Sequence, residues 1–170
     1  MKNNKKYDYG MIVGKFSPIH IGHEKLIDKS LEICNKTLII VTNSKNDTID
    51  IYKRINLIKK IYSNEINLNK LDIVEFKNPT VFNLKYGDLL FEKYFKVMNN
   101  YPEVVIYGSD KDISFCFRKE LIEKLTTIVV KRDDVSSTKV RTLLKENKNI
   151  KIKEMINEKI IKDIDKSILK

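Results

Sequence analysis

The chain has 170 residues, of which 42% are hydrophobic and 33% are charged, a balance typical of a folded globular protein and not of a disordered one. Its length suits a single domain over residues 1–170 that buries a core without disulfides or a structural metal. The net charge of +10 attracts phosphate groups, but the lysines are spread along the whole chain, without an arginine-rich tract or zinc-finger spacing. We therefore do not expect a nucleic-acid partner.

The sequence contains no sign of a membrane segment or a disulfide framework. Its first nine residues are polar and lysine-rich, and no stretch approaches the ~20 apolar residues that a membrane-spanning helix needs. We therefore expect a cytoplasmic protein without a membrane partner. The two cysteines, Cys34 and Cys116, lack metal-binding spacing and lie in apolar patterns of helical periodicity, so we expect both to be buried, reduced thiols.

Apolar runs of strand length alternate with segments of helical periodicity. In chain order, the strands are expected at 9–14, 38–42, 71–76, 103–107 and 127–130. The helices are expected at 22–34, 51–62, 90–98, 113–125, 136–145 and 152–168. This alternation predicts an α/β fold, a doubly wound parallel sheet with helices on both faces and ligands at the carboxyl ends of its strands. The last helix could cover the sheet or contact another subunit, so a homo-oligomer stays open.

The segment GKFSPIHIGH, residues 14–23, follows the first strand and opens the first helix. The only two histidines of the chain, His20 and His23, lie three residues apart at this helix start and therefore project toward the same space. Gly22 lets the backbone approach a ligand closely, the helix N-terminus attracts phosphate, and Lys15 adds a mobile cation. These groups together could hold a triphosphate and stabilise charge that develops on it. The alternative is an ordinary loop whose histidines cap the helix or pack.

A second segment, SSTKVR at 136–141, follows the fifth strand and opens another helix. Ser136, Ser137 and Thr138 place three hydroxyl groups at a helix N-terminus, where side chains and backbone N–H groups bind phosphate. Arg141 lies one turn later and could reach the same phosphate with a charge-assisted hydrogen bond. Plain helix capping is the alternative.

Four further candidates follow the other strands. Gly108 and Asp110, directly after the fourth strand, could approach a ribose and accept its hydroxyls, or simply form a turn with a helix cap. Lys45, just past the second strand, could steady phosphates, although a solvated loop lysine is the default. Arg54 lies early in the second helix, where a surface position is equally expected.

The segment 14–23 resembles the nucleotidyltransferase superfamily marked by the HxGH signature, on Gly14, Phe16, Pro18, His20, Gly22 and His23. Ser17 stands where bacterial adenylyltransferases of the superfamily often have aspartate. The SSTKVR segment looks like the SSTxxR signature of the same superfamily. The resemblance implies a Rossmann-like five-stranded parallel sheet and an ATP site. The nucleotide-binding residues would then be Gly14, Phe16, Ser17, Gly22, Gly108, Asp110, Ser136, Ser137 and Thr138, with catalysis by Lys15, His20, His23 and Arg141.

The GxD pattern at 108–110 and Thr138 are similar to nicotinate or nicotinamide mononucleotide adenylyltransferases. This resemblance implies transfer of AMP from Mg-ATP to a pyridine mononucleotide, with Mg²⁺ held mostly by substrate and water because the sequence shows no carboxylate cage. That family places a tryptophan after the pattern, and this chain has none. Phe115 or Phe117 could stack on the pyridine ring instead. Arg54 matches a family arginine and, with Lys45, completes the expected acceptor-binding set.

Other activities stay open at this point. Within the superfamily, a cytidylyltransferase acting on a small phosphorylated alcohol and a phosphopantetheine adenylyltransferase are the nearest alternatives. A non-catalytic nucleotide sensor or an RNA-binding relative would be an alternative of another class. The intact histidine pair together with Arg141 favours an enzyme.

Overall fold

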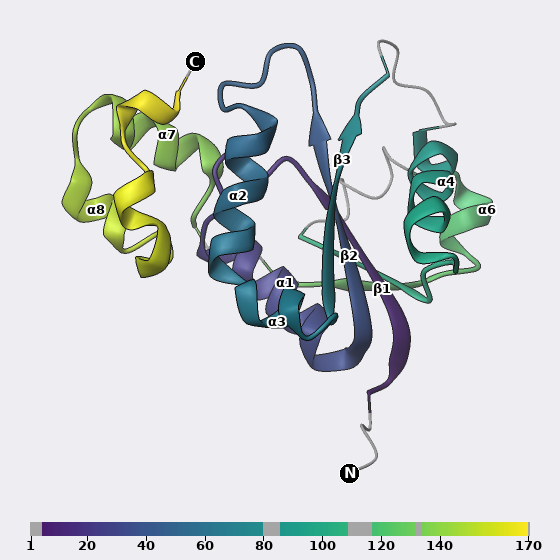
Figure 1. The fold of residues 1–170 in the computed structure, drawn as a ribbon. Coiled ribbons are helices and arrows are strands. Elements are labelled where there is room, and N and C mark those ends of the chain that lie inside the picture. Colours follow the sequence, from purple (N-terminus) through teal and green to yellow (C-terminus); the bar gives the residue numbers. More distant parts are fainter. Residues whose placement is uncertain (1–4, 80–85, 109–116, 132–133, 170) are drawn as a thin grey trace.

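The computed structural model describes residues 5–79, 86–108, 117–131 and 134–169. The strands of this part of the chain form one parallel sheet in the order β3-β2-β1-β4-β5. They are β1 (Tyr7–Gly14), β2 (Cys34–Asn43), β3 (Leu71–Lys77), β4 (Val104–Tyr107) and β5 (Thr126–Val129). The chain runs outward from β1 to β3 and then crosses to β4, on the other side of β1 (Figure 1). The strand order therefore reverses between β1 and β4, and sheets of this kind bind ligands beyond the carboxyl ends of the strands at such a point.

Helices cover both faces of the sheet, as predicted (Figure 1). One face carries α1 (Ile21–Ile33), α2 (Ile51–Ile61), α3 (Ser63–Asn67), α7 (Ser137–Lys145) and α8 (Asn149–Lys153). The other face carries α4 (Tyr86–Met98) and α6 (Lys119–Ile122). Alternation along the strands divides the core accordingly, since Ile12 and Ile39 pack on the α1–α2 side while Met11 and Leu38 pack on the α4 side. The predicted α/β Rossmann-like sheet is confirmed.

The chain turns from α1 into β2 without an intervening loop. The sequence placed Cys34 in a helix, but it is the first residue of β2, with an extended backbone (φ −110°, ψ 145°) whose N–H still donates to the Ser30 carbonyl. The Cys34 thiol is buried and free, and this burial raises its pKa. Cys116 lies outside the described residues.

Two predicted helices differ from the structure. The pattern at 152–168 forms α8 and two short 3₁₀ helices, η1 (Glu158–Asp163) and η2 (Lys166–Ile168). The Asn157 and Asp165 side chains accept hydrogen bonds from backbone N–H groups two residues later, and such local bonds compete with a continuous helix. Of the predicted helix at 113–125, residues 113–116 lie outside the described residues, and the rest forms only the single turn of α6.

The C-terminal segment folds back over α2 and reaches the start of α1. Asp163 pairs with Lys60 at 2.6 Å, and the Lys159 ammonium donates to the Ile61 carbonyl at 2.9 Å. Leu169 forms an isolated antiparallel bridge with Ile49. At the other end of the segment, the Ile21 N–H donates to the Met155 carbonyl at 3.0 Å, so this segment helps to fix the first residue of α1.

Arg54 on α2 is a charged side chain at the centre of this packing. Its side chain is fully buried, which excludes the alternative of a surface position on the helix. The guanidinium donates to the carbonyls of Lys15 at 2.6 Å and Thr42 at 2.9 Å, and to the side chains of Asn43 at 3.0 Å and Asp47 at 3.1 Å. Arg54 thereby connects the loop after β1, the loop after β2 and α2.

Gly10 lies where β1 passes beneath the junction of α1 and β2. A Cβ atom at this position would lie 2.6 Å from Cys34 Sγ and 2.8 Å from Ser30 Oγ. Because both side chains are short and buried, Gly10→Ala is expected to lower the free energy of unfolding by about 1–3 kcal/mol in urea denaturation. In a Cys34→Ala protein, which lacks the nearest atom, Gly10→Ala should lower the free energy of unfolding by less. If Gly10→Ala costs the same free energy of unfolding with and without the Cys34 thiol, the contact with Cys34 Sγ is not the cause of the destabilisation.

Asp47 gives the fold a defined sensitivity to acid. Burial alone would raise the pKa of its carboxyl, but hydrogen bonds from the Ser44 N–H, Lys15 and the Ser44 hydroxyl hold that pKa below its usual range. A carboxyl of this kind contributes stability that is fully present above its unfolded pKa of about 3.9 and is lost as the pH falls through the lower folded value.

Asp47→Asn is therefore expected to lower the free energy of unfolding by about 3–5 kcal/mol at neutral pH, because it leaves the Arg54 charge buried without its counter-charge. The difference in free energy of unfolding between the variant and the wild type should decrease as the pH falls below about 4. Urea unfolding across this pH range measures both effects. A gap that stays constant with pH would contradict the proposed origin of the stability.

Candidate active site

The loop that joins β1 to α1 begins at Gly14 and turns sharply at Phe16. A Cβ atom on Gly14 would lie 3.0 Å from the Phe16 ring, so the glycine makes room for it. Phe16 adopts a left-handed backbone (φ 50°), and its side chain is buried. The Phe16 ring lies 4.7 Å, centroid to centroid, from the ring of His23. Phe16 thus backs the imidazole from inside the protein.

The two histidines lie side by side at the start of α1. Their ring centroids are 3.9 Å apart with the planes tilted by 32°. His20 is the N-cap residue of α1, and its Nδ1 accepts a hydrogen bond from the Gly22 N–H at 3.1 Å. A neutral His20 with Nδ1 as acceptor carries its proton on Nε2.

Gly22 has a more specific role than the sequence indicated. A Cβ atom on Gly22 would lie 3.1 Å from both Nδ1 and Cε1 of His20. The glycine therefore makes space for the His20 ring folded back over the helix start. The proposed close approach of a ligand to the Gly22 backbone stays a prediction.

The second predicted motif lies against the first. Ser136 caps α7 by accepting from the Lys139 N–H, while the Ser137 hydroxyl donates to the Pro18 carbonyl at 3.0 Å. Arg141 donates to the Ser17 carbonyl and, at 3.1 Å, to the Thr138 hydroxyl. A guanidinium has five N–H groups, so these two contacts orient Arg141 and leave donors for a phosphate. Two motifs more than a hundred residues apart in the chain thus form one site.

Lys15 brings a cation to the same loop. Its ammonium lies 3.0 Å from both Ser44 Oγ and Asp47 Oδ1, in the loop after β2, and just over half of its side chain is exposed. Lys45 lies in that loop as well and is exposed. The acceptor role predicted for Lys45 stays a prediction.

The remaining predicted residues have mixed placements. Gly108 is buried and follows β4 directly, beside the carboxyl end of β1. Asp110 and Phe115 lie outside the described residues. Phe117 is buried in the core on the α4 side, with its ring edge-on to Phe91 at 5.6 Å, a position that does not support stacking on an acceptor. The buried position of Arg54 likewise does not support direct contact with an acceptor.

Two residues near the site were missed in the sequence. Asp47 carries no motif, and only its ion pairs with Lys15 and Arg54 reveal it. Glu24, in the first turn of α1, accepts a hydrogen bond from the Asn157 side chain at 2.7 Å. Burial raises the pKa of the Glu24 carboxyl, and the Asn157 hydrogen bond only partly opposes this effect. The helix-start position of Glu24 was visible in the sequence, but its partner was not.

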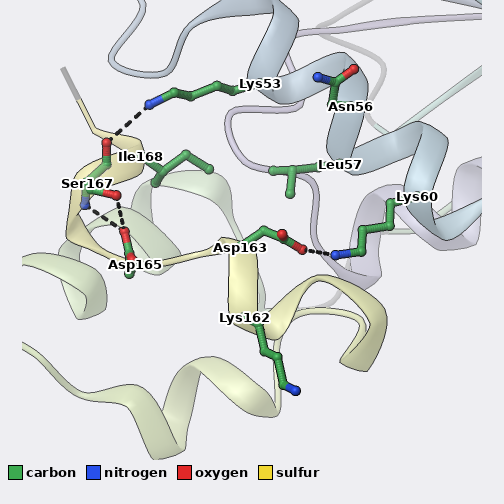
Figure 2. Close-up of a pocket in the computed structure, with 9 residues that line it drawn as sticks. All are labelled: Lys53, Asn56, Leu57, Lys60, Lys162, Asp163, Asp165, Ser167 and Ile168. Atoms are coloured by element: carbon green, nitrogen blue, oxygen red, sulfur yellow. Dashed lines mark hydrogen bonds and ion pairs between the residues drawn. The ribbon is translucent and has the colours of Figure 1, made fainter.

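A cavity of about 410 Å³ lies away from these groups, between α2 and the C-terminal 3₁₀ helices (Figure 2). Leu57 and Ile168 contribute apolar surface, and contacts of Lys60 with Asp163 and of Lys53 with the Ser167 carbonyl cross it. Its lining includes none of the predicted site residues. The residues predicted to bind phosphate instead lie at the end of β1 and at the starts of α1 and α7.

In the described parts of the chain, no three His, Cys, Asp or Glu side chains are grouped so that they could hold a metal ion. None of the helices formed by the described residues is long and apolar enough to cross a membrane.

Known proteins resemble this chain in sequence and in fold. Residues 11–154 match the cytidylyltransferase-like family. A phosphopantetheine adenylyltransferase of Fusobacterium nucleatum is 26% identical over 166 residues, which cover 91% of this chain and 93% of the relative. A "probable nicotinate-nucleotide adenylyltransferase" of the same bacterium is 24% identical over 187 residues, which cover 92% and 96%.

Among solved structures, a bifunctional NMN adenylyltransferase/ADP ribose pyrophosphatase from Francisella tularensis superposes with a TM-score of 0.71 at 19% identity, over 83% of this chain and 43% of that protein. This chain therefore spans less than half of that protein, and the likeness concerns the fold alone. The family match, in contrast, is a match of sequence, which runs from within β1 through α8 and includes both predicted motifs. The chain belongs to the cytidylyltransferase-like family of nucleotidyltransferases.

Proposed function

We propose that this protein transfers an adenylyl group from ATP to nicotinamide or nicotinic acid mononucleotide and releases pyrophosphate. The observation that carries the proposal is the junction of the two motifs, in which Ser137 and Arg141 hydrogen-bond to the loop that precedes the His20–His23 pair. Imidazole, hydroxyl and guanidinium donors thereby converge on one place, as a triphosphate requires.

The reaction needs no covalent enzyme intermediate. A phosphate oxygen of the acceptor attacks the α-phosphorus of ATP in line, and the bond from this phosphorus to the β-phosphate oxygen breaks, so pyrophosphate leaves with the electron pair. His20 and His23 donate to the phosphate oxygens, while Lys15 and Arg141 neutralise charge that grows on the pyrophosphate. Catalysis of this kind rests on positioning and electrostatic stabilisation. Mg²⁺ enters as part of the Mg-ATP substrate, bound mostly by phosphate and water oxygens.

Several features support a pyridine mononucleotide as the acceptor. The GxD pattern that begins at Gly108 and the threonine at position 138 are both similar to pyridine mononucleotide adenylyltransferases. Gly108 follows β4 next to β1, and Thr138 lies in the α7 motif beside Arg141. One relative that aligns with nearly the whole chain carries the name of a nicotinate-nucleotide adenylyltransferase. A phosphopantetheine adenylyltransferase is the second candidate, because another relative with that name is 26% identical to this chain.

The acceptor can be identified by measuring pyrophosphate release from Mg-ATP with a panel of acceptors. We expect release with nicotinamide or nicotinic acid mononucleotide and none with 4′-phosphopantetheine or phosphorylated alcohols. Release with 4′-phosphopantetheine alone would establish the second candidate. A folded protein that binds ATP but releases no pyrophosphate with any acceptor or triphosphate would instead be a nucleotide sensor.

His20→Ala is expected to lower kcat by about 100- to 1,000-fold, because it removes a donor to the reacting phosphate. The variant also loses the N-cap of α1, which by itself destabilises the protein by about 1 kcal/mol. Asp50→Ala is the matched control, since Asp50 caps α2 by accepting from the N–H groups of Tyr52 and Lys53. Asp50→Ala should lose similar stability and keep its turnover. Wild-type turnover of a folded His20→Ala protein would exclude His20 from catalysis.

A further inference from the structure

Lys15 is held at both ends by one buried ion pair. Its backbone carbonyl accepts a hydrogen bond from Arg54 at 2.6 Å, and its ammonium donates to Asp47 at 3.0 Å. Asp47 and Arg54 are themselves paired at 3.1 Å, with side chains that are 3% and 0% exposed. The three residues therefore form a closed ring of contacts that spans the loop after β1, the loop after β2 and α2.

The charges of this ring favour an anion. A Lys15–Asp47 pair alone would be neutral and would compete with a phosphate for the ammonium. Arg54 supplies a second positive charge to Asp47, so the three side chains together keep a net charge of +1. A cation that is partnered in this way still attracts a phosphate group.

The geometry also leaves Lys15 a hydrogen-bond donor. An ammonium group has three N–H donors. Two of those of Lys15 donate to Ser44 Oγ and Asp47 Oδ1 within the described residues. Among the residues that the structure describes, the third N–H has no partner, so it can donate to a ligand oxygen. A lysine on a flexible chain loses rotamer freedom when it binds a phosphate, and a lysine that is already fixed loses less.

We infer that Asp47 and Arg54 are positioning residues, which hold Lys15 in place for the phosphates of the nucleotide. The inference rests on the proposed function, because it takes Mg-ATP as the ligand of Lys15. It gives Arg54 a role that its burial supports, namely action through Lys15 and not through contact with the acceptor. A purely structural ion pair would stabilise the fold without any dependence on Lys15.

A double-mutant cycle separates these two roles. The dissociation constant of Mg-ATP is measured by calorimetric titration for wild type, Asp47→Asn, Lys15→Met and the double variant, each shown to be folded by circular dichroism. We expect Asp47→Asn to weaken binding about tenfold when Lys15 is present and less than about twofold when it is absent. Asp163→Asn, which breaks the surface pair with Lys60, is the matched control and should change affinity little in either background.

Ser44→Ala serves as a second probe if Asp47→Asn does not fold. It removes one acceptor of the Lys15 ammonium and leaves the Asp47–Arg54 pair in place. Its loss of affinity, about threefold, should likewise vanish in the Lys15→Met background.

Each other outcome has a distinct meaning. Equal losses in both Lys15 backgrounds would overturn the inference and leave the ion pair a purely structural role. Tighter binding by Asp47→Asn would also overturn it, because Asp47 would then restrain Lys15 from the phosphate. If Lys15→Met binds Mg-ATP with unchanged affinity, Lys15 is not a phosphate ligand and the inference is overturned. The proposed function would then still rest on the other groups. Failure of the wild type to bind Mg-ATP would overturn the proposed function itself, and the inference with it.

Discussion

A buried guanidinium keeps its positive charge, so the cost of its burial must be offset by hydrogen bonds to oxygen atoms, and Arg54 has four such partners. Arg54 reaches from α2 to the carbonyl of Lys15, the residue after β1, and to that of Thr42, the last residue but one of β2. An isolated buried charge is so unfavourable that neither loop can move far without loss of stability. The carboxyl ends of the two central strands are therefore fixed by one side chain.

The two signature motifs of the site depend on each other in a similar way. The loop before α1 offers the carbonyls of Ser17 and Pro18, and α7 satisfies them with Arg141 and Ser137. The side chains that we assign to phosphate binding are thus also the ones that hold the loop. Motifs of this type combine a chemical and a structural role, so a substitution in either will affect both, and stability must be measured beside activity.

The sequence predicted the parts of the molecule that local patterns determine. Buried parallel strands appear as continuous apolar runs, and each motif predicted to bind phosphate lies at the start of a helix that follows a strand. The surroundings of Arg54 could not be predicted, because its contact with Lys15 joins residues 39 positions apart through loops without periodicity. The segment 152–168 kept a helical apolar pattern, yet Asn157 and Asp165 bind their own neighbouring backbone and interrupt it. Phe117 illustrates the same limit, since an aromatic side chain in the core and one at a ligand look identical in a sequence.

The contact between the Ile21 N–H and the Met155 carbonyl has a consequence for biosynthesis. The loop that joins β1 to α1 leaves the ribosome early, before α7 and the C-terminal segment have been synthesised. Until those residues emerge, the Ile21 N–H and the carbonyls of Ser17 and Pro18 lack the hydrogen-bond partners that they have in the folded protein. All five strands precede α7 in the chain, so a translation product that stops short of α7 contains every strand of the sheet and lacks the Ser137 and Arg141 side chains that hold the loop before α1.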